Sequence, residues 1–164
     1  MHGLMNSRWA RSFFVVSILI SGCVQKVGGL PVIHYGKDVC AECRMIIMDK
    51  RFASAIQSGS DDILKFDDIG CMILYERKNS IASKYSWVHD YVTGEWLESG
   101  KAFFVHSTQL VTPMGHGIAA FSSRGDAMRF LEKQEGQVLP VGAIFNALQK
   151  NVKPFKGGNQ NEEG

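Results

Sequence analysis

One pattern recurs along the sequence at a fixed spacing and constrains the fold more than any other feature. The segments KFDDIGCMILYERK (65–78) and AFSSRGDAMRFLEK (120–133) align at one constant offset, so that Phe66 corresponds to Phe121 and Gly70 to Gly125. Each begins with strand-like residues ending in phenylalanine, continues with two residues suited to cap a helix, and ends in an amphipathic helical pattern. The chain is therefore predicted to use one strand-strand-helix unit twice.

Strand-like segments lie where this repeat requires them. A turn at Gly59 separates the first pair, and the loop TPMGHG (112–117) separates the second. The four segments are RFASAIQ (51–57), DILKF (62–66), KAFFVHS (101–107) and GIAAF (117–121). We expect a strand and then a Thr93-Gly94 turn within 85–96, a last strand at 137–141 and a short helix at 142–150. The predicted class is α+β, with two ββαβ-like units at about 45–90 and 100–145, antiparallel strands and helices packed on the sheets.

Short polar motifs predict how the helices begin. The pairs Asp67-Asp68 and Ser122-Ser123 are expected to cap the two repeated helices, and Ser123 with Asp126 fits a capping box. Asp49 is expected to close a turn.

The N-terminus predicts export and lipidation. Basic residues precede the apolar run FFVVSILI (13–20), which is too short for a permanent membrane span and is followed by ISGC (20–23). This order indicates a lipoprotein signal at 1–22 with Cys23 acylated, although a secretory signal with a chance cysteine is an alternative. Residues 23–30 are then a lipidated tether, 31–155 the folded domain and 156–164 a disordered tail.

Charge gives no support for a nucleic-acid partner. The chain has 18 Lys and Arg against 16 Asp and Glu, but the signal contains Arg8 and Arg11 and no acidic residue. The mature protein is therefore formally neutral, and we expect it not to bind nucleic acid.

The remaining thiols belong to Cys40, Cys43 and Cys71, an odd number that does not indicate a disulfide framework. At least one of them must be buried or have another role. The Cys40-x-x-Cys43 pair allows three interpretations. A thiol-disulfide oxidoreductase is one, but the residues that follow contain no clear helix cap. A zinc site is another, but no second Cys pair is present.

The third interpretation is a site for Cu(I), which thiolate and thioether sulfurs select. Met45 follows Cys43 by two residues, a spacing that brings both sulfurs to one side of an extended segment. Met114 lies between proline and glycine in a loop where an apolar side chain has little core to join, and His116 shares that loop. The other candidates are expected to be core residues: Cys71, Met48, Met72 and Met128.

Several blocks together resemble the NosL family of nitrous oxide reductase accessory lipoproteins. The resemblance covers roughly residues 20 to 135 and rests on the lipobox and the following blocks: DVCAECRMIIMD (38–49), FDDIGCMILY (66–75), DYVTGEWLES (90–99), AFFVHS (102–107) and TPMGHGIAAF (112–121). It implies two ββαβ units and a Cu(I) site in which the family's Cys-x-Met core falls on Cys43 and Met45 and its Met-Gly loop on Met114 and Gly115. Cys40 would be an auxiliary ligand or a redox partner of Cys43. His116 is a further candidate ligand because of its place in the Met114 loop, and not because of the resemblance.

The resemblance also implies a function. The chain is expected to be a copper chaperone and not an enzyme, held by its lipid on the periplasmic face of a bacterial membrane. Its expected partners are nitrous oxide reductase and the machinery that matures the reductase's copper centre. The periplasmic CxxC oxidoreductase is the alternative, and the oligomeric state is left open.

Overall fold

The computed structural model describes residues 29–59 and 62–151. The expected signal, Cys23, most of the tether and the tail lie outside these ranges. Within them, no helix is both long and apolar enough to span a bilayer.

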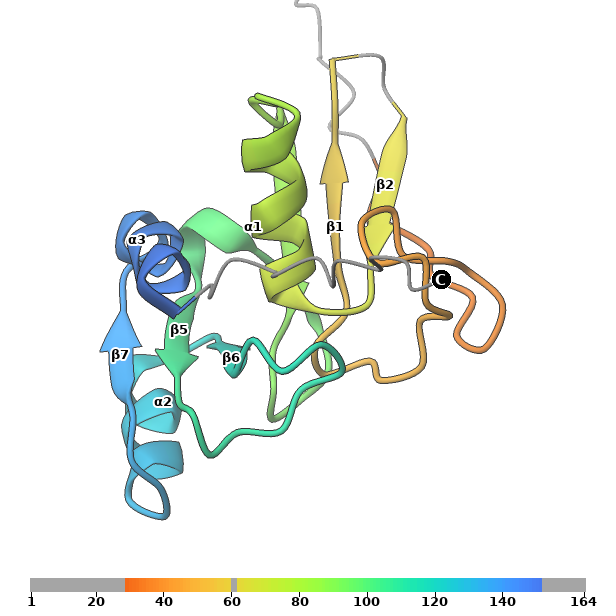
Figure 1. Ribbon diagram of the computed structural model, residues 1–164. Coiled ribbons are helices and arrows are strands. Elements are labelled where there is room, and N and C mark those ends of the chain that lie inside the picture. Colours follow the sequence, from red (N-terminus) through yellow and green to blue (C-terminus); the bar gives the residue numbers. More distant parts are fainter. Residues whose placement is uncertain (1–28, 60–61, 152–164) are drawn as a thin grey trace, which may run out of the picture.

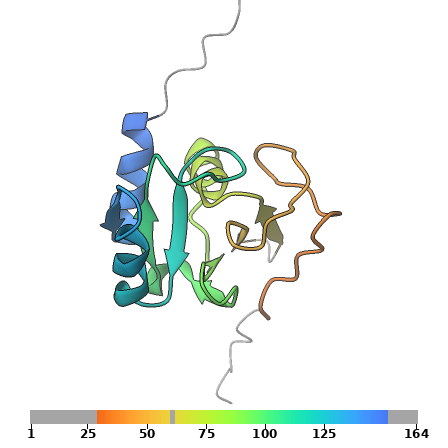
Figure 2. The same ribbon diagram turned by 90° about the horizontal axis from the view of Figure 1, so that it is seen from below.

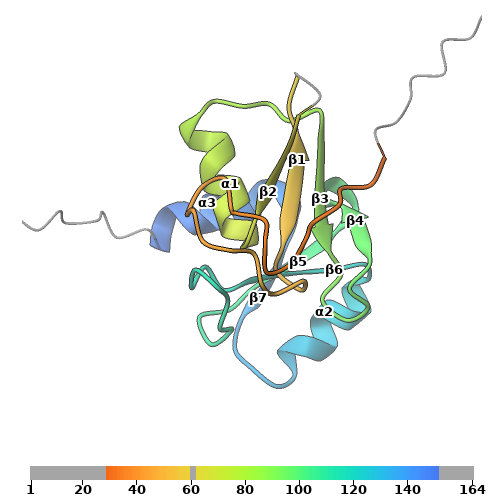
Figure 3. The same cartoon turned by 90° about the vertical axis from the view of Figure 1, so that its right-hand side faces the viewer.

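The first unit is a four-stranded antiparallel sheet with one helix. The strands are β1 (Ser54–Gln57), β2 (Ile63–Phe66), β3 (Tyr85–His89) and β4 (Trp96–Glu98), in the order β2-β1-β3-β4. Helix α1 (Ile69–Lys78) follows β2 and packs beside it and β1 (Figure 3). The sequence predicted a turn after β3, and the chain continues beyond that turn into β4, which was not predicted.

The second unit repeats this arrangement. A short 3-10 helix, η1 (Ser99–Lys101), precedes β5 (Phe103–His106), β6 (Ile118–Phe121), α2 (Arg124–Leu131), β7 (Gln137–Leu139) and α3 (Val141–Asn151). The antiparallel order β6-β5-β7 places β5 at the centre, as β1 lies between β2 and β3. The predicted α+β class with two ββαβ-like units is confirmed.

The second sheet is buried on both faces, because its strand residues alternate between two cores. Phe104, Ile118 and Ala120 face the larger core, which also contains residues of α1, α3 and the first sheet. Val105, Ala119 and Phe121 face a smaller core closed by α2. Figure 2 shows α1 between the second sheet and the β1–β2 pair. The two units therefore share one core instead of folding as separate bodies.

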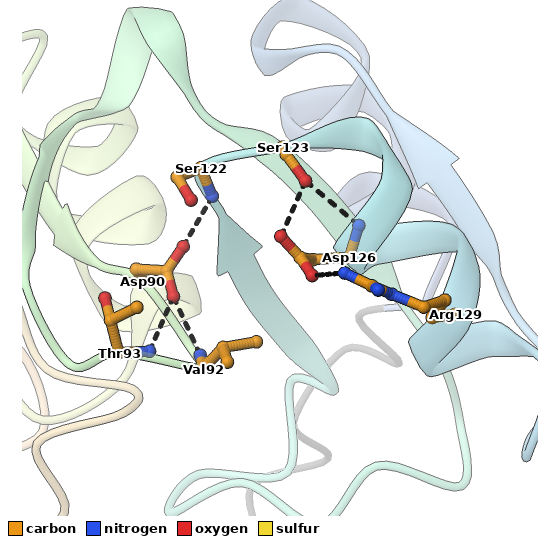
Figure 4. A network of polar contacts seen from close by, with 7 residues as sticks. All are labelled: Asp90, Val92, Thr93, Ser122, Ser123, Asp126 and Arg129. Atoms are coloured by element: carbon orange, nitrogen blue, oxygen red, sulfur yellow. Dashed lines mark hydrogen bonds and ion pairs between the residues drawn. The ribbon is translucent and has the colours of Figure 1, made fainter.

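Both repeated helices begin at equivalent caps. Asp68 accepts a hydrogen bond from the Gly70 N–H (2.7 Å), and Ser123, its counterpart in the second repeat, accepts one from the Asp126 N–H (3.1 Å). Half of the predicted capping box is confirmed. The Asp126 carboxylate accepts from the Ser123 hydroxyl and pairs with Arg129 (Figure 4). Asp67 does not cap: it accepts from the Met48 N–H (3.4 Å).

A buried carboxylate joins the units. Asp90, which follows β3, accepts from the Val92 and Thr93 N–H groups (both 2.8 Å) and from the Ser122 N–H (2.6 Å) ahead of α2 (Figure 4). The Tyr91 N–H donates to the Ala120 carbonyl at 2.8 Å. These bonds lower the pKa of Asp90 against the effect of burial, and they fix the start of α2 relative to the first sheet.

Candidate metal centre

The CxxC pair lies in a tight turn and not at the start of a helix. Val39 and Ile46 form an antiparallel bridge, the Cys40 N–H donates to the Met45 carbonyl (2.8 Å), and the Arg44 N–H donates to the Cys40 carbonyl (3.1 Å). Arg44 closes the turn at φ 66°, in the left-handed region. The pair therefore does not lie at a helix start, as it does in a typical CxxC oxidoreductase.

This turn is held against β2. The Ala41 N–H donates to the Lys65 carbonyl at 2.9 Å. The Lys65 ammonium in turn forms an ion pair with Asp38 at 2.7 Å. Both contacts anchor the cysteine turn to the strand that leads into α1.

The docked turn brings a third thiol into reach. Cys71 lies in the first turn of α1, and its sulfur and those of Cys40 and Cys43 are all within 4.8 Å of one another. Cys40 and Cys71 are fully buried, Cys43 is half-buried, and all three are free thiols. Three sulfurs at this separation can hold one metal ion. Because sulfur is a soft donor, the site favours a soft ion.

The pKa values of the three thiols are shifted in different directions. A hydrogen bond from the Cys71 thiol lowers the pKa of Cys40 to about 5, against the effect of burial, and the backbone N–H groups of Asp67, Cys43 and Glu42 add to the lowering. Burial raises the pKa of Cys43. The hydrogen bond to Cys40, followed by burial, raises the pKa of Cys71. Cys40 is therefore the most acidic of the three thiols. Its predicted role was that of an auxiliary ligand.

The loop that carries Met114 reaches the same junction. Asp68, besides capping α1, accepts from the Thr112 hydroxyl (2.6 Å) and from the Met114 N–H (3.1 Å). Figure 1 shows this β5–β6 loop passing below the start of α1, toward the segment that carries the cysteine turn. The two predicted halves of the site thus both contact the β2–α1 junction: Cys40 through the Asp67 N–H, and Met114 through Asp68.

His116 is half-buried and lies directly on α1. A Cβ added to Gly70 would lie 2.2 Å from its Cγ atom, so the imidazole occupies the space that a side chain at that position would need. Only glycine at position 70, next to Cys71, allows this contact.

The methionines divide differently from the prediction. Met72 is buried, as expected, but Met48 and Met128 are 69% and 50% exposed, so their assignment to the core was wrong. Met48 lies in an irregular segment in which Ile47 takes the buried side. Met45 and Met114 are also exposed, at 58% and 40%. The ligand roles predicted for Cys43, Met45, Met114, Cys40 and His116 stay predictions.

Cys71 was assigned to the core, and it is both a core residue and a member of the thiol cluster. One signal in the sequence pointed to it. The odd number of thiols required burial or another role for at least one of them.

The NosL family model matches residues 31–148. Among solved structures, the fold resembles the crystal structure of the copper chaperone NosL from Shewanella denitrificans, with a TM-score of 0.60 and 20% sequence identity over 68% of this chain and 91% of that one. No curated protein sequence matches the chain. The family match spans the cysteine turn, α1 and the Met114 loop, and the chain therefore belongs to the NosL family.

Proposed function

We propose that this protein is a Cu(I) chaperone that is anchored by a lipid at Cys23 on the periplasmic face of the membrane and supplies copper for maturation of nitrous oxide reductase. The observation that carries the proposal is the cluster of three thiols within 4.8 Å, at the junction where the Met114 loop also lies. Thiolates and thioethers favour a soft monovalent ion, whereas Zn²⁺ takes its four ligands from thiolate, imidazole and carboxylate groups.

The exposure of the sulfurs suits delivery. Thiolates supply most of the affinity, while Met45 and Met114 are neutral, weaker donors with part of their surface in solvent. A partner's ligand can approach the ion from that side. The lipid anchor would keep the search near the membrane, where the effective concentration of a membrane-bound partner is high.

Metal selectivity tests this function. Met45→Leu and Met114→Leu should each weaken Cu(I) binding in an anaerobic competition with a chelator and leave Zn²⁺ binding unchanged, because leucine removes only the thioether. Met128→Leu is the matched control, since Met128 is similarly exposed on α2 but is not part of the cysteine turn or of the Met114 loop. Equal Cu(I) affinity in all three variants would remove the thioethers from the proposal, and no Cu(I) binding by the wild type would overturn it.

The CxxC oxidoreductase is a second candidate because the pKa of Cys40 is lowered to about 5, a feature of reactive thiols. It predicts turnover of a small disulfide substrate that is lost in both Cys40→Ser and Cys43→Ser. The chaperone proposal predicts no such turnover by the wild-type protein.

A further inference from the structure

We infer that Cys71 is a third thiolate ligand, and that it retains the ion on the buried side of the cluster while Cys43 lies on the side open to exchange. This inference rests on the proposed function and deepens it, because it gives separate roles in retention and exchange to Cys71, which comes from α1, and to Cys43, which comes from the segment that carries the Cys-x-Met core.

Burial separates the three sulfurs into two kinds. Cys40 and Cys71 have 0% and 1% of their surface exposed, whereas Cys43 is half-buried. An incoming ligand therefore meets the ion on the Cys43 side. An ion bonded to Cys40 and Cys71 as well is held partly inside the core, away from water and from competing ligands.

The secondary structure that carries Cys71 also differs from that which carries Cys43. Cys71 is fixed by the capped first turn of α1 and packs among the buried residues Ile69, Met72 and Ile73. Cys43 lies in the turn that closes at Arg44, whose left-handed φ of 66° places it outside regular structure. Ligands on a rigid element hold a fixed geometry, and a turn residue can move as the ion leaves.

A core cysteine with no further role would be surrounded by apolar atoms. Cys71 instead hydrogen-bonds to the Cys40 sulfur and has two sulfurs within 4.8 Å. Its sulfur already lies where a ligand is needed. On loading, the bond from the ion to the Cys71 sulfur forms as the thiol proton passes to solvent. On release, bonds from the ion to the incoming soft ligands replace the bond to Cys43 first and the bond to Cys71 last, and the Cys71 sulfur takes up a proton again. Copper stays monovalent, so no electron is transferred.

The test compares Cys71→Ser and Cys71→Ala with Met72→Leu, a neighbouring buried residue on the same helix. Each protein is loaded anaerobically with one Cu(I), and the affinity and the rate of copper release to excess bicinchoninate are measured. Loss of an outer-shell partner costs roughly 10–100-fold in metal affinity, so loss of a ligand should cost at least about that much. We expect this weakening and a correspondingly faster release in both Cys71 variants, and wild-type values in Met72→Leu.

Serine buries a polar hydroxyl in the core, whereas alanine leaves a small cavity. An effect that arises from misfolding should therefore differ between the two variants and should also appear in the circular dichroism of the metal-free protein. Wild-type affinity and release in a folded Cys71 variant would overturn the inference and leave the proposed function standing. No Cu(I) binding by the wild type would overturn the proposed function itself.

Discussion

Replacement of Asp68 by alanine should destabilise the protein far more than replacement of Ser123, its counterpart in the second repeat. Both residues cap a helix, and loss of a cap costs about 1 kcal/mol. Asp68, which is fully buried, also accepts hydrogen bonds from the Thr112 hydroxyl and from the Met114 N–H, and these tie the second unit to the first.

The size of the difference follows from these bonds. A hydrogen bond to a charged group is worth about 1.5–3 kcal/mol, and the lower value applies here because part of the loop can recover hydrogen bonds to water. Two such bonds make Asp68→Ala about 3 kcal/mol more destabilising than Ser123→Ala. Ser123→Ala is a suitable control because its hydroxyl bonds only within the start of α2 among the described contacts.

The assay is urea unfolding of both variants beside the wild type, with the free energy taken from the midpoint at constant slope. Hydrogen exchange at the Met114 amide should also become faster in Asp68→Ala and stay unchanged in Ser123→Ala. Equal destabilisation of the two variants, with Met114 exchange unaltered, would refute the argument that Asp68 positions the loop.

Two further perturbations test the fold around the site. Gly115 and Gly117 both have positive φ, but a Cβ at Gly117 would lie 2.2 Å from the Ser107 carbonyl oxygen, whereas nothing lies within 4 Å at Gly115. In thermal unfolding, Gly115→Ala should cost about 1–2 kcal/mol and Gly117→Ala clearly more, and equal costs would contradict the contact. His89 is buried between the Tyr35 hydroxyl (2.9 Å) and the Gly94 carbonyl (2.9 Å), and burial lowers its pKa to about 4. The unfolded chain binds this proton near pH 6.5, so the stability present above that pH should fall on acidification toward pH 4, by at most on the order of 3 kcal/mol. Urea midpoints measured across this range should show the fall in the wild type and a weaker one in His89→Gln.

The repeat explains why the fold could be predicted from the sequence. Phe66 and Phe121 end equivalent strands, and Asp68 and Ser123 cap equivalent helices. These features are local, because they depend on residue spacing and on the hydrogen-bonding chemistry of short segments. Strand β4 was not predicted because the turn after β3 was expected to end this strand region. The Asp90 N–H donates to the Glu95 carbonyl, and after this turn the chain pairs with β3 as β4.

The candidate site was predicted only in part, because its assembly depends on long-range docking. Cys71 and Cys43 belong to segments that are far apart in the sequence, and their contact requires the cysteine turn to bond to β2 through the Ala41 N–H. No local pattern specifies that bond. The prediction that Met48 is a core residue was wrong for a related reason. The apolar run that contains it predicted a regular element with a buried face, but the segment is irregular and leaves the Met48 side chain in solvent.

The most direct test of the central claim is an anaerobic Cu(I) titration of the wild type and of a variant in which Cys40, Cys43 and Cys71 are all serine, in competition with a chelator. We expect one tightly bound Cu(I) per wild-type chain, preferred over Zn²⁺, and loss of that site in the variant. Binding that survives without the three thiols, or a wild type that prefers Zn²⁺, would contradict it.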